Sequence, residues 1–281
     1  MAENRNSINK ILVALDDSPS SLTALENAVR LASRLGAELT GWYVEDINLL
    51  RLAQLPSPSE LNFYASTFRQ LESGDIECQL KAQAGRIRRI LTNLCEKWNV
   101  PCDFKVTRGN VAAELLESSE QADLMVIGKI GRSFPSTRRT GSITRTIISR
   151  RPGMTMIFQQ DTLLTYPVIL LYDGSEPSKR AVDAAAHLKT MHDGNLLVMV
   201  LGKNSKEAEK LASEIADHPM IQGTNPQFRL IPRSPLPVIA RRIRMEESQG
   251  PVVIPCDPEN LEEEQLCALV DEISNPVMLI R

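Results

Sequence analysis

An internal repeat is the feature of this sequence that most restricts its fold. Residues 11–18 read as an apolar run followed by Asp, one further residue and Ser, and residues 168–175 read the same way, so that Asp16 matches Asp173 without a gap. Apolar residues then recur at helical spacing in both copies, and a second short apolar run follows. We therefore predict two copies of one unit, and 281 residues are an ordinary length for two small domains.

The alternation of apolar runs with helical patterns predicts the fold class. Short apolar runs bounded by turn residues are typical of strands covered on both faces, and alternation with helices indicates crossovers in a parallel sheet. We predict an α/β fold with domains at residues 1–160 and 161–281, each a five-stranded parallel sheet with helices on both faces. In the first copy, strands are expected at 10–15, 38–44, 103–107, 124–128 and 154–158, and helices at 19–35, 77–98, 111–120 and 142–150. Residues 46–76 lack a clear period and are expected to be partly helical.

Charge balance and cysteine usage exclude several classes of protein. Lys and Arg total 32 against 35 for Asp and Glu, a formal net charge of -3, which gives no overall positive field for nucleic acid or an anionic membrane. Every apolar run falls short of the ~18 residues of a membrane helix, and the N-terminal residues lack the apolar core of a signal peptide. The five cysteines include no C-x-x-C pair, which argues against a disulfide framework or a structural zinc site. We expect a cytoplasmic protein with neither nucleic acid nor a membrane as partner.

A segment with three glycines carries the strongest functional signal. Gly128 directly follows an apolar run, Gly131 comes three residues later, and Gly141 and Ser142 open the next expected helix. Glycine lets backbone N–H groups come close to oxygen atoms, and the start of a helix adds free N–H donors and a partial positive charge. This pattern is typical of a loop that binds phosphate.

Basic residues accompany these glycines. Lys129, Arg132, Arg138 and Arg139 would help to neutralise a polyphosphate. The segment has neither the Walker pattern nor the Gly-x-Gly-x-x-Gly pattern of dinucleotide-binding folds. A structural strand-to-helix turn with surface arginines is therefore the alternative that the segment alone leaves open.

The spacing of the glycines resembles that of a known family. Gly-x-x-Gly, nine residues and then Gly-[Ser/Thr] is similar to the nucleotide signature of the universal stress protein family, and Gly128, Gly131, Gly141 and Ser142 fit it without adjustment. The first-run Asp16 also stands in the family's order. The resemblance covers nearly the whole chain as two copies, so the chain is similar to the tandem type of this family. It implies two tandem Rossmann-like domains of the adenine nucleotide alpha hydrolase-like class.

The resemblance implies an adenine nucleotide site in the first copy. Asp16 stands where family members contact the nucleoside, Val44 where the backbone contacts adenine, and the glycines with Ser142 where the phosphates are held. This agrees with the rule that open parallel sheets bind ligands beyond the carboxyl ends of their strands. The expected ligand is ATP, with Mg²⁺ as an accompanying ion, and no catalytic residue or resident metal is expected. The candidate binding residues are Ala14, Leu15, Asp16, Val44, Ile127, Gly128, Gly131, Arg132, Gly141, Ser142 and Ile143.

The second copy departs from this pattern. Pro255 stands where the first copy has Gly128, no glycine follows Gly250, and a short acidic stretch comes next. Proline removes an N–H donor, and the carboxylates would repel phosphates. We predict that the second copy binds no nucleotide at the corresponding place and has a structural or regulatory role.

Two other groups of charged residues need an interpretation. Asp16 and Asp17 are adjacent, which would suit a catalytic carboxylate pair or a Mg²⁺ ligand. Neighbouring residues at a strand end point to opposite sides, so we prefer Asp16 as a nucleoside contact and expect Asp17 to be a helix-capping or surface residue. The run from Arg86 to Ile90 is expected to be the charged face of a helix, with a phosphate or RNA patch as the alternative.

Three functions stay open. The first is a cytoplasmic ATP-binding stress-response protein, in which nucleotide orders residues 128–142 and changes the surface shown to partners. The second is a slow ATPase or phosphotransfer enzyme, although no His, Asp or Glu between residues 128 and 142 could act as a general base. The third is a nucleotide-free adaptor or ligand-sensing protein.

The resemblance also implies that strands 154–158 and 277–281 pair across a pseudo-twofold axis, as a dimer within one chain, and a further homodimer is expected.

Overall fold

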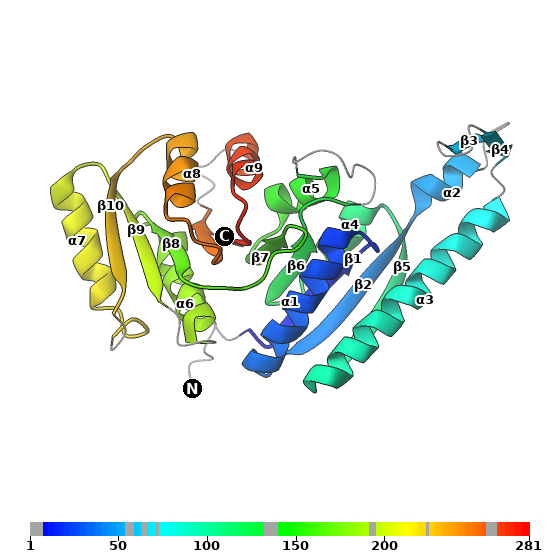
Figure 1. The fold of residues 1–281 in the computed structure, drawn as a ribbon, viewed down its shortest axis with the longest axis horizontal. Coiled ribbons are helices and arrows are strands. Elements are labelled where there is room, and N and C mark those ends of the chain that lie inside the picture. The colour runs from blue at the N-terminus through cyan, green and yellow to red at the C-terminus, as the bar shows by residue number, and fades with distance from the viewer. Residues whose placement is uncertain are drawn as a thin grey trace.

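A single ten-stranded sheet organises the chain (Figure 1). The computed structural model describes residues 8–53, 59–62, 67–70, 73–131, 140–190, 195–222, 225–256 and 263–281. Within these ranges the strand order is β10-β9-β8-β11-β12-β7-β6-β1-β2-β5. Neighbouring strands run parallel everywhere except at β12 and β7, which are antiparallel. The sheet therefore consists of two parallel five-stranded halves with the same internal order, and the predicted α/β class is confirmed.

The elements of the first half follow the predicted order. Its five large-sheet strands are β1 (Lys10–Leu15), β2 (Glu38–Asp46), β5 (Cys102–Gly109), β6 (Leu124–Gly128) and β7 (Met154–Phe158). Its principal helices are α1 (Pro19–Leu35), α3 (Ser73–Trp98), α4 (Val111–Ser119) and α5 (Ser142–Arg150). Helix α1 shows why the sequence folds this way, because Ser18 caps its first turn and Gly36 ends it in the left-handed conformation at φ 65°.

The elements of the second half take equivalent places. Its strands are β8 (Val168–Tyr172), β9 (Leu196–Gly202), β10 (Gln227–Pro232), β11 (Val252–Pro255) and β12 (Val277–Ile280). Its helices are α6 (Glu176–Thr190), α7 (Ser205–Ala216), α8 (Leu236–Met245) and α9 (Glu263–Glu272). Asp173 accepts hydrogen bonds from the backbone N and the Oγ of Ser175, and Asp16 does the same with Ser18. The matching turns follow from the repeated Asp-x-Ser sequence.

The two halves meet at the centre of the sheet. Residues of β12 pair with residues of β7 in the register Val277 to Ile157 and Ile280 to Met154, as the sequence predicts for these two strands. The terminal Arg281 extends the junction, since its backbone N donates to Gly153 O and its side chain donates to Ser149 O. Pairing gives both strands a hydrogen-bonded neighbour on each side, because β6 and β11 flank them, and neither is left as a bare edge.

Helices cover both faces of the sheet, and the apolar residues alternate accordingly. Ile11, Val13 and Leu15 belong to the core on the side of α1, α3, α6 and α7, whereas Leu12 and Ala14 belong to the core on the side of α4, α5, α8 and α9. The central strands are buried on both faces, which explains why they read as continuous apolar runs. Each of the two core layers extends across both halves of the sheet.

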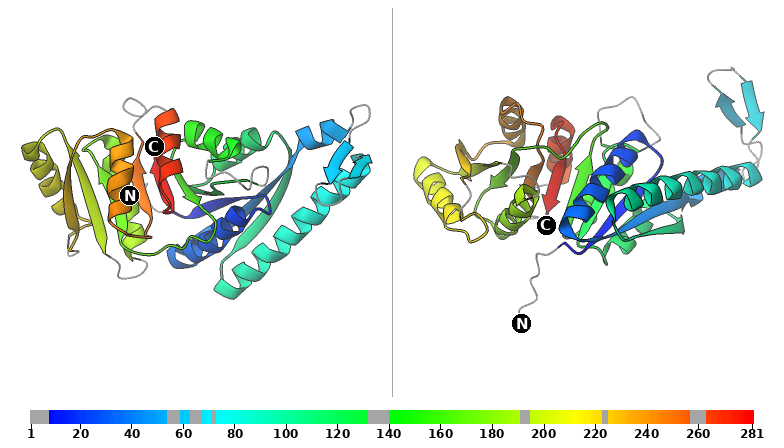
Figure 2. Two further views of the ribbon diagram at one scale, coloured as in Figure 1. Left: turned by 45° about the horizontal axis from the view of Figure 1, so that its top comes forward. Right: turned by 60° about the horizontal axis from the view of Figure 1, so that its bottom comes forward.

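One part of the first half differs from the prediction. The segment expected to be partly helical does contain α2 (Ile47–Ala53), but it also contains an antiparallel pair, β3 (Ser59–Asn62) with β4 (Thr67–Gln70). Helix α3 begins at Ser73, earlier than the expected residue 77. Figure 2 shows the pair at the far end of α3, away from the ten-stranded sheet. Strands of four residues are too short to show a clear alternation in the sequence.

Candidate functional site

A cavity of about 980 Å³ lies at the carboxyl ends of β1, β2 and β6. Pockets that hold drug-sized ligands measure about 300–1,000 Å³, so this one has room for a nucleotide. Its wall is completed by residues of α3 and by the start of α5, including Gln83 and Ile143. The cavity therefore lies where ligands bind in open parallel sheets.

The structure brings most of the candidate residues together around this cavity. The residues that line it include Ala14, Leu15, Asp16, Val44, Ile127, Gly128, Gly131, Gly141, Ser142 and Ile143. Arg132 and the other arginines of the glycine segment lie outside the described residues. The candidates come from four elements because parallel strands end at one edge of the sheet, and that edge also receives the N-terminus of α5.

The turn after β1 fixes the orientation of Asp16. Its Oδ1 accepts from the backbone N of Ser18 at 3.1 Å and from Ser18 Oγ at 2.6 Å. Its backbone N donates to Ser21 Oγ at 3.1 Å, and its carbonyl accepts from Gln83 Nε2 at 3.1 Å. The turn is therefore held from α1 and from α3, and the carboxylate lies at the cavity wall in a defined position.

Gly128 and Gly131 allow close approaches that a larger residue would prevent. A Cβ on Gly128 would lie 2.6 Å from Ser20 Oγ and 2.8 Å from the backbone N of Ser21. A Cβ on Gly131 would lie 3.0 Å from Asp16 Oδ2. The strand end can therefore pack directly against the first turn of α1, and the carboxylate of Asp16 lies beside the glycine segment.

The start of α5 presents backbone donors to the cavity. Gly141 is the N-cap residue, so it has no side chain that could cap the first N–H groups of the helix. Its own N donates to Lys129 O at 2.9 Å, and Thr144 Oγ1 donates to Gly128 O at 2.9 Å. The hydroxyl of Thr144 is thus engaged with the protein, while Ser142 is exposed at the cavity. Such a helix start favours an anion.

Carboxylates reach the cavity from the sheet even though the glycine segment contains none. Asp16 and Asp46 both line the cavity, and Asp46 accepts from the backbone N of Asn48 at 2.9 Å. A general base was sought only among residues 128–142, so Asp46, which joins the cavity from the end of β2, was missed. Within the described parts of the chain, no group of three His, Cys, Asp or Glu side chains could hold a metal ion.

Helix α3 supplies Gln83, a residue that the sequence did not single out. Gln83 bridges the β1 and β2 ends, since it donates to Asp16 O and accepts from Tyr43 OH at 3.0 Å. Asp17, in the left-handed conformation at φ 62°, forms an ion pair of 3.0 Å with Arg86. Of the two alternatives expected for Asp17, the capping position of α1 belongs to Ser18, and Asp17 lies half-buried beside Arg86.

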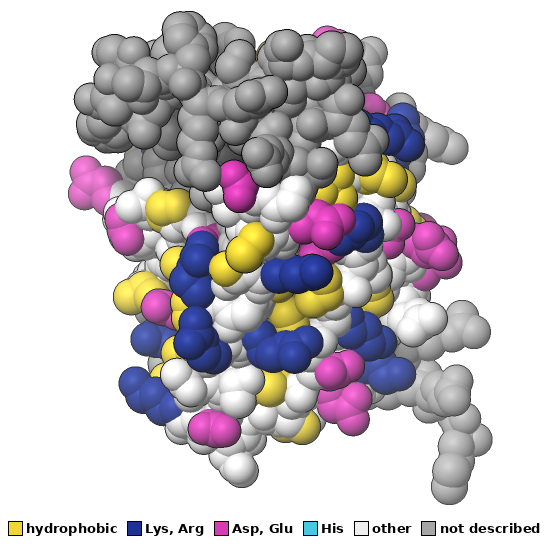
Figure 3. Space-filling view, turned by 90° about the vertical axis from the view of Figure 1, so that its right-hand side faces the viewer, with side chains coloured by type: hydrophobic (Ala, Val, Ile, Leu, Met, Phe, Trp, Pro, Cys, Tyr) yellow, Lys and Arg dark blue, Asp and Glu magenta, His cyan; other side chains and the backbone are white. Residues whose placement is uncertain are grey.

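Two cations on the side of α3 and β5, Arg88 and Lys105, pack over aromatic rings of the chain. Figure 3 views the end of the molecule with α3 and β5, where Lys and Arg side chains gather among apolar ones. Arg88 lies over the ring of Phe104 at 5.2 Å, and Lys105 lies over the ring of Trp42 at the same distance. Such stacking lets a long basic side chain cover apolar surface while its charge stays near water, which fits a charged helix face at Arg88.

Lys129 differs from its expected role. It was expected to neutralise phosphates, but its side chain is only 2% exposed, and its Nζ donates to Val270 O of α9 at 2.8 Å. Burial lowers the pKa of Lys129 from its usual 10.5 to about 8, and the charge of Asp271 opposes this effect. The side chain points into the second half of the molecule, where the carbonyl groups ending α9 accept from it.

The lowered pKa of Lys129 predicts a pH-dependent stability. Between pH about 8 and 10.5, the unfolded chain holds a proton that the folded protein has released, so the free energy of unfolding should rise with pH. The gain should reach up to about 3 kcal/mol relative to Lys129→Met, in which this group is absent. Urea unfolding of both proteins at several pH values checks this. If the free energy of unfolding of the wild type, relative to that of Lys129→Met, stays constant or falls above pH 8, the prediction is wrong.

Comparison of the sequence with models of known protein families identifies one family. The model of the Universal stress protein family matches residues 7–159, which is more than half of the chain. The chain belongs to the universal stress protein family. The resemblance expected from the glycine spacing is thereby confirmed. No curated protein sequence matches this universal stress protein closely enough to be counted as a relative.

Solved structures support the same fold over the full length. A universal stress protein from Archaeoglobus fulgidus superposes with a TM-score of 0.73 over 97% of this chain and 96% of that chain, at 14% identity. A putative universal stress protein from Pseudomonas aeruginosa gives 0.59 over 99% and 95%, at 11% identity. A protein of unknown function from Pseudomonas aeruginosa gives 0.61 over 98% and 93%, at 10% identity. At such identities the likeness shows the Rossmann-like fold of this universal stress protein and nothing finer.

One further finding concerns membranes. Among the helices that the structure describes, none combines the length and the apolar character needed to cross a bilayer.

Proposed function

We propose that this universal stress protein binds an adenine nucleotide, ATP, in the cavity of its first half. The observation that carries the proposal is the meeting of the closely packed Gly128 turn, the uncapped start of α5 and the carboxylate of Asp16 around one cavity. A glycine turn before an uncapped helix start is the usual arrangement for phosphate. Family membership supports the same ligand class.

The lining residues suggest how the ligand would lie. The phosphates would face the start of α5 at Gly141 and Ser142, while the nucleoside would lie along the strand ends near Ala14 and Val44. Asp16, between these two regions, would accept a hydrogen bond from the nucleoside. Mg²⁺ would be bound chiefly by the phosphates, since the described residues offer only isolated carboxylates.

The second half would serve the first in this proposal. Its strand β11 ends at Pro255 where β6 ends at Gly128, and proline has no backbone N–H to offer a phosphate there. We infer that residues 161–281 form a second domain that binds no nucleotide there. With β7 paired to β12, the chain would take the place of a dimer, act in the cytoplasm and present a nucleotide-dependent surface to partners.

Ser142→Asp should separate nucleotide binding from folding. An added carboxylate at the first position of α5 would repel the phosphates, whereas the same charge favours the helix start. We expect the affinity for ATP to fall at least about tenfold, and the affinity for adenosine to change by less than about twofold. Calorimetric titration with ATP and adenosine measures both, and thermal unfolding checks the fold.

Ser142→Ala is the matched control, and it should bind ATP nearly as well as the wild type. The nucleotide content of protein purified without added ligand gives an independent measurement by mass spectrometry. Absence of any adenine nucleotide, together with a titration that shows no binding of ATP, would refute the proposal and favour the nucleotide-free adaptor. Phosphate released during the titration with Mg²⁺ would reveal ATPase activity.

A further inference from the structure

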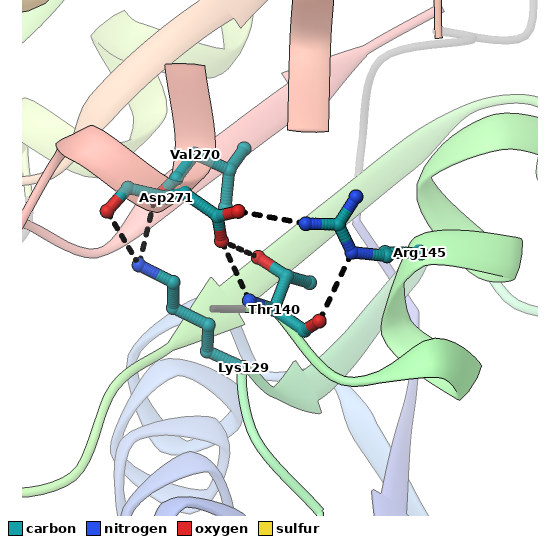
Figure 4. A network of polar contacts seen from close by, with 5 residues as sticks. All are labelled: Lys129, Thr140, Arg145, Val270 and Asp271. Atoms are coloured by element: carbon teal, nitrogen blue, oxygen red, sulfur yellow. Dashed lines mark hydrogen bonds and ion pairs between the residues drawn. The ribbon is translucent and has the colours of Figure 1, made fainter. Parts of the chain in front are cut away.

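A polar network joins the glycine segment of the first half to helix α9 of the second half (Figure 4). Asp271 Oδ1 accepts from the backbone N of Thr140 and from Thr140 Oγ1, both at 2.6 Å. Asp271 Oδ2 forms an ion pair of 2.7 Å with Arg145. Lys129 Nζ donates to Val270 O at 2.8 Å and to Asp271 O at 3.3 Å. One turn of α9 therefore contacts both ends of the glycine segment.

The position of Asp271 in α9 is not explained by the helix itself. The carboxylate lies in the last turn, where the helix dipole disfavours negative charge, and this turn contains no basic residue. Arg145 and Thr140 of the other half compensate the charge, and charge-assisted hydrogen bonds of this length are among the strong ones in proteins. The side chain of Asp271 is only 19% exposed, and the lower dielectric constant of such surroundings strengthens its ion pair with Arg145.

The network acts on the residue that precedes the start of α5. Thr140 lines the cavity, and the next residue, Gly141, is the N-cap of α5. Arg145 also donates from Nε to Thr140 O at 3.1 Å, so both the N–H and the carbonyl of Thr140 are fixed. Asp271 is not among the described residues that line the cavity. Its contacts nevertheless hold the residue directly before the N-cap of α5.

We propose that Asp271 is a positioning residue for the phosphate part of the nucleotide site, and that the second half thereby controls the affinity of the first half for ATP. The inference rests on the proposed function. It assigns the second half a definite role: α9 holds Thr140 in place before ligand arrives, so the backbone donors need no rearrangement on binding. Phosphate affinity should depend on this contact, and nucleoside affinity should not.

Asp271→Asn tests this role, because it keeps the size of the side chain and removes its charge. We expect the affinity for ATP to fall about tenfold and the affinity for adenosine to change by less than about twofold. In the ligand-free protein, the amides of residues 140–144 should exchange faster with solvent, which hydrogen-exchange mass spectrometry measures. Glu272→Gln is the matched control, since Glu272 is adjacent but pairs with Arg244 on α8. It should leave both affinities unchanged.

Arg145→Gln provides a second variant in case Asp271→Asn folds poorly. It breaks the same ion pair from the other half and should also weaken ATP without weakening adenosine. The double variant should bind ATP about as well as the weaker of the two single variants, because both remove one interaction. If wild-type protein bound ATP and the variants bound it equally well, this inference alone would fall. If wild-type protein bound no ATP, the proposed function would fall, and the positioning role with it.

Discussion

Gly128→Ala should destabilise the folded protein and abolish tight binding of ATP. The added Cβ would lie 2.6 Å from Ser20 Oγ, 2.8 Å from the backbone N of Ser21 and 2.9 Å from the carbonyl carbon of Ser20. Two of these three atoms are backbone, so the first turn of α1 must move away from the end of β6. Overpacking of this kind costs about 1–3 kcal/mol, and the movement displaces the cavity wall beside Asp16.

The free energy of unfolding from urea titration and the ATP affinity from calorimetry check both effects. Gly85→Ala is the matched control, because Gly85 lies within α3 and a Cβ there would have no neighbour within 4 Å. Alanine is the better helix former, so this control should gain about 0.5–1 kcal/mol. A Gly128→Ala protein as stable as the wild type would show that the strand end and α1 are not packed as closely as the structure has them.

Arg151→Met should cost about 3–5 kcal/mol of stability, since it removes a buried guanidinium that donates to several carbonyl groups. The Arg151 side chain is 3% exposed. Its guanidinium donates to the carbonyls of Ser119 and Ala122 after α4, at 3.3 and 3.0 Å, and to Pro152 O before β7 at 3.0 Å. Burial lowers its pKa to about 10. The residue therefore joins the end of α4 to the strand that meets the second half.

Arg150→Met, one position earlier, is the control, because Arg150 is exposed. It should change stability by less than about 0.5 kcal/mol. Urea unfolding compares the two variants directly. Equal stabilities for Arg151→Met and Arg150→Met would show that water can replace the guanidinium at these carbonyls.

The proposed positioning role of the second half agrees with its contacts to the first. Its sheet completes the first half through β7 and β12, and its α9 contacts both ends of the glycine segment. A proline at position 255, where β11 ends, is compatible with this role, because packing and positioning need no glycine there. The repeat would then keep its fold while its function diverged, since fold depends on buried apolar patterns and binding depends on a few residues at strand ends.

The repeat and the strand-helix alternation were predictable because they depend on local patterns. Buried strands require continuous apolar runs, and helices require the 3.6-residue period with caps such as Ser18 and Gly36, so both leave a signal in a short window. Ten of the eleven candidate binding residues lie around one cavity for a related reason, because parallel strand ends share an edge. Their role in binding stays a prediction, and Arg132 lies outside the described residues.

Contacts between distant segments were not predictable, and they decide the chemistry of the site. Lys129 reads as a phosphate-binding cation, yet the structure buries it against α9, 141 residues further along the chain. Asp271 reads as one more acid on a helix, yet it holds Thr140 across the two halves. The sequence by itself determined the strands and helices of the large sheet and the edge where a ligand would bind, but not the β3–β4 pair. Only the tertiary structure decided which charges face the cavity, because that depends on side-chain packing between segments that no local pattern relates.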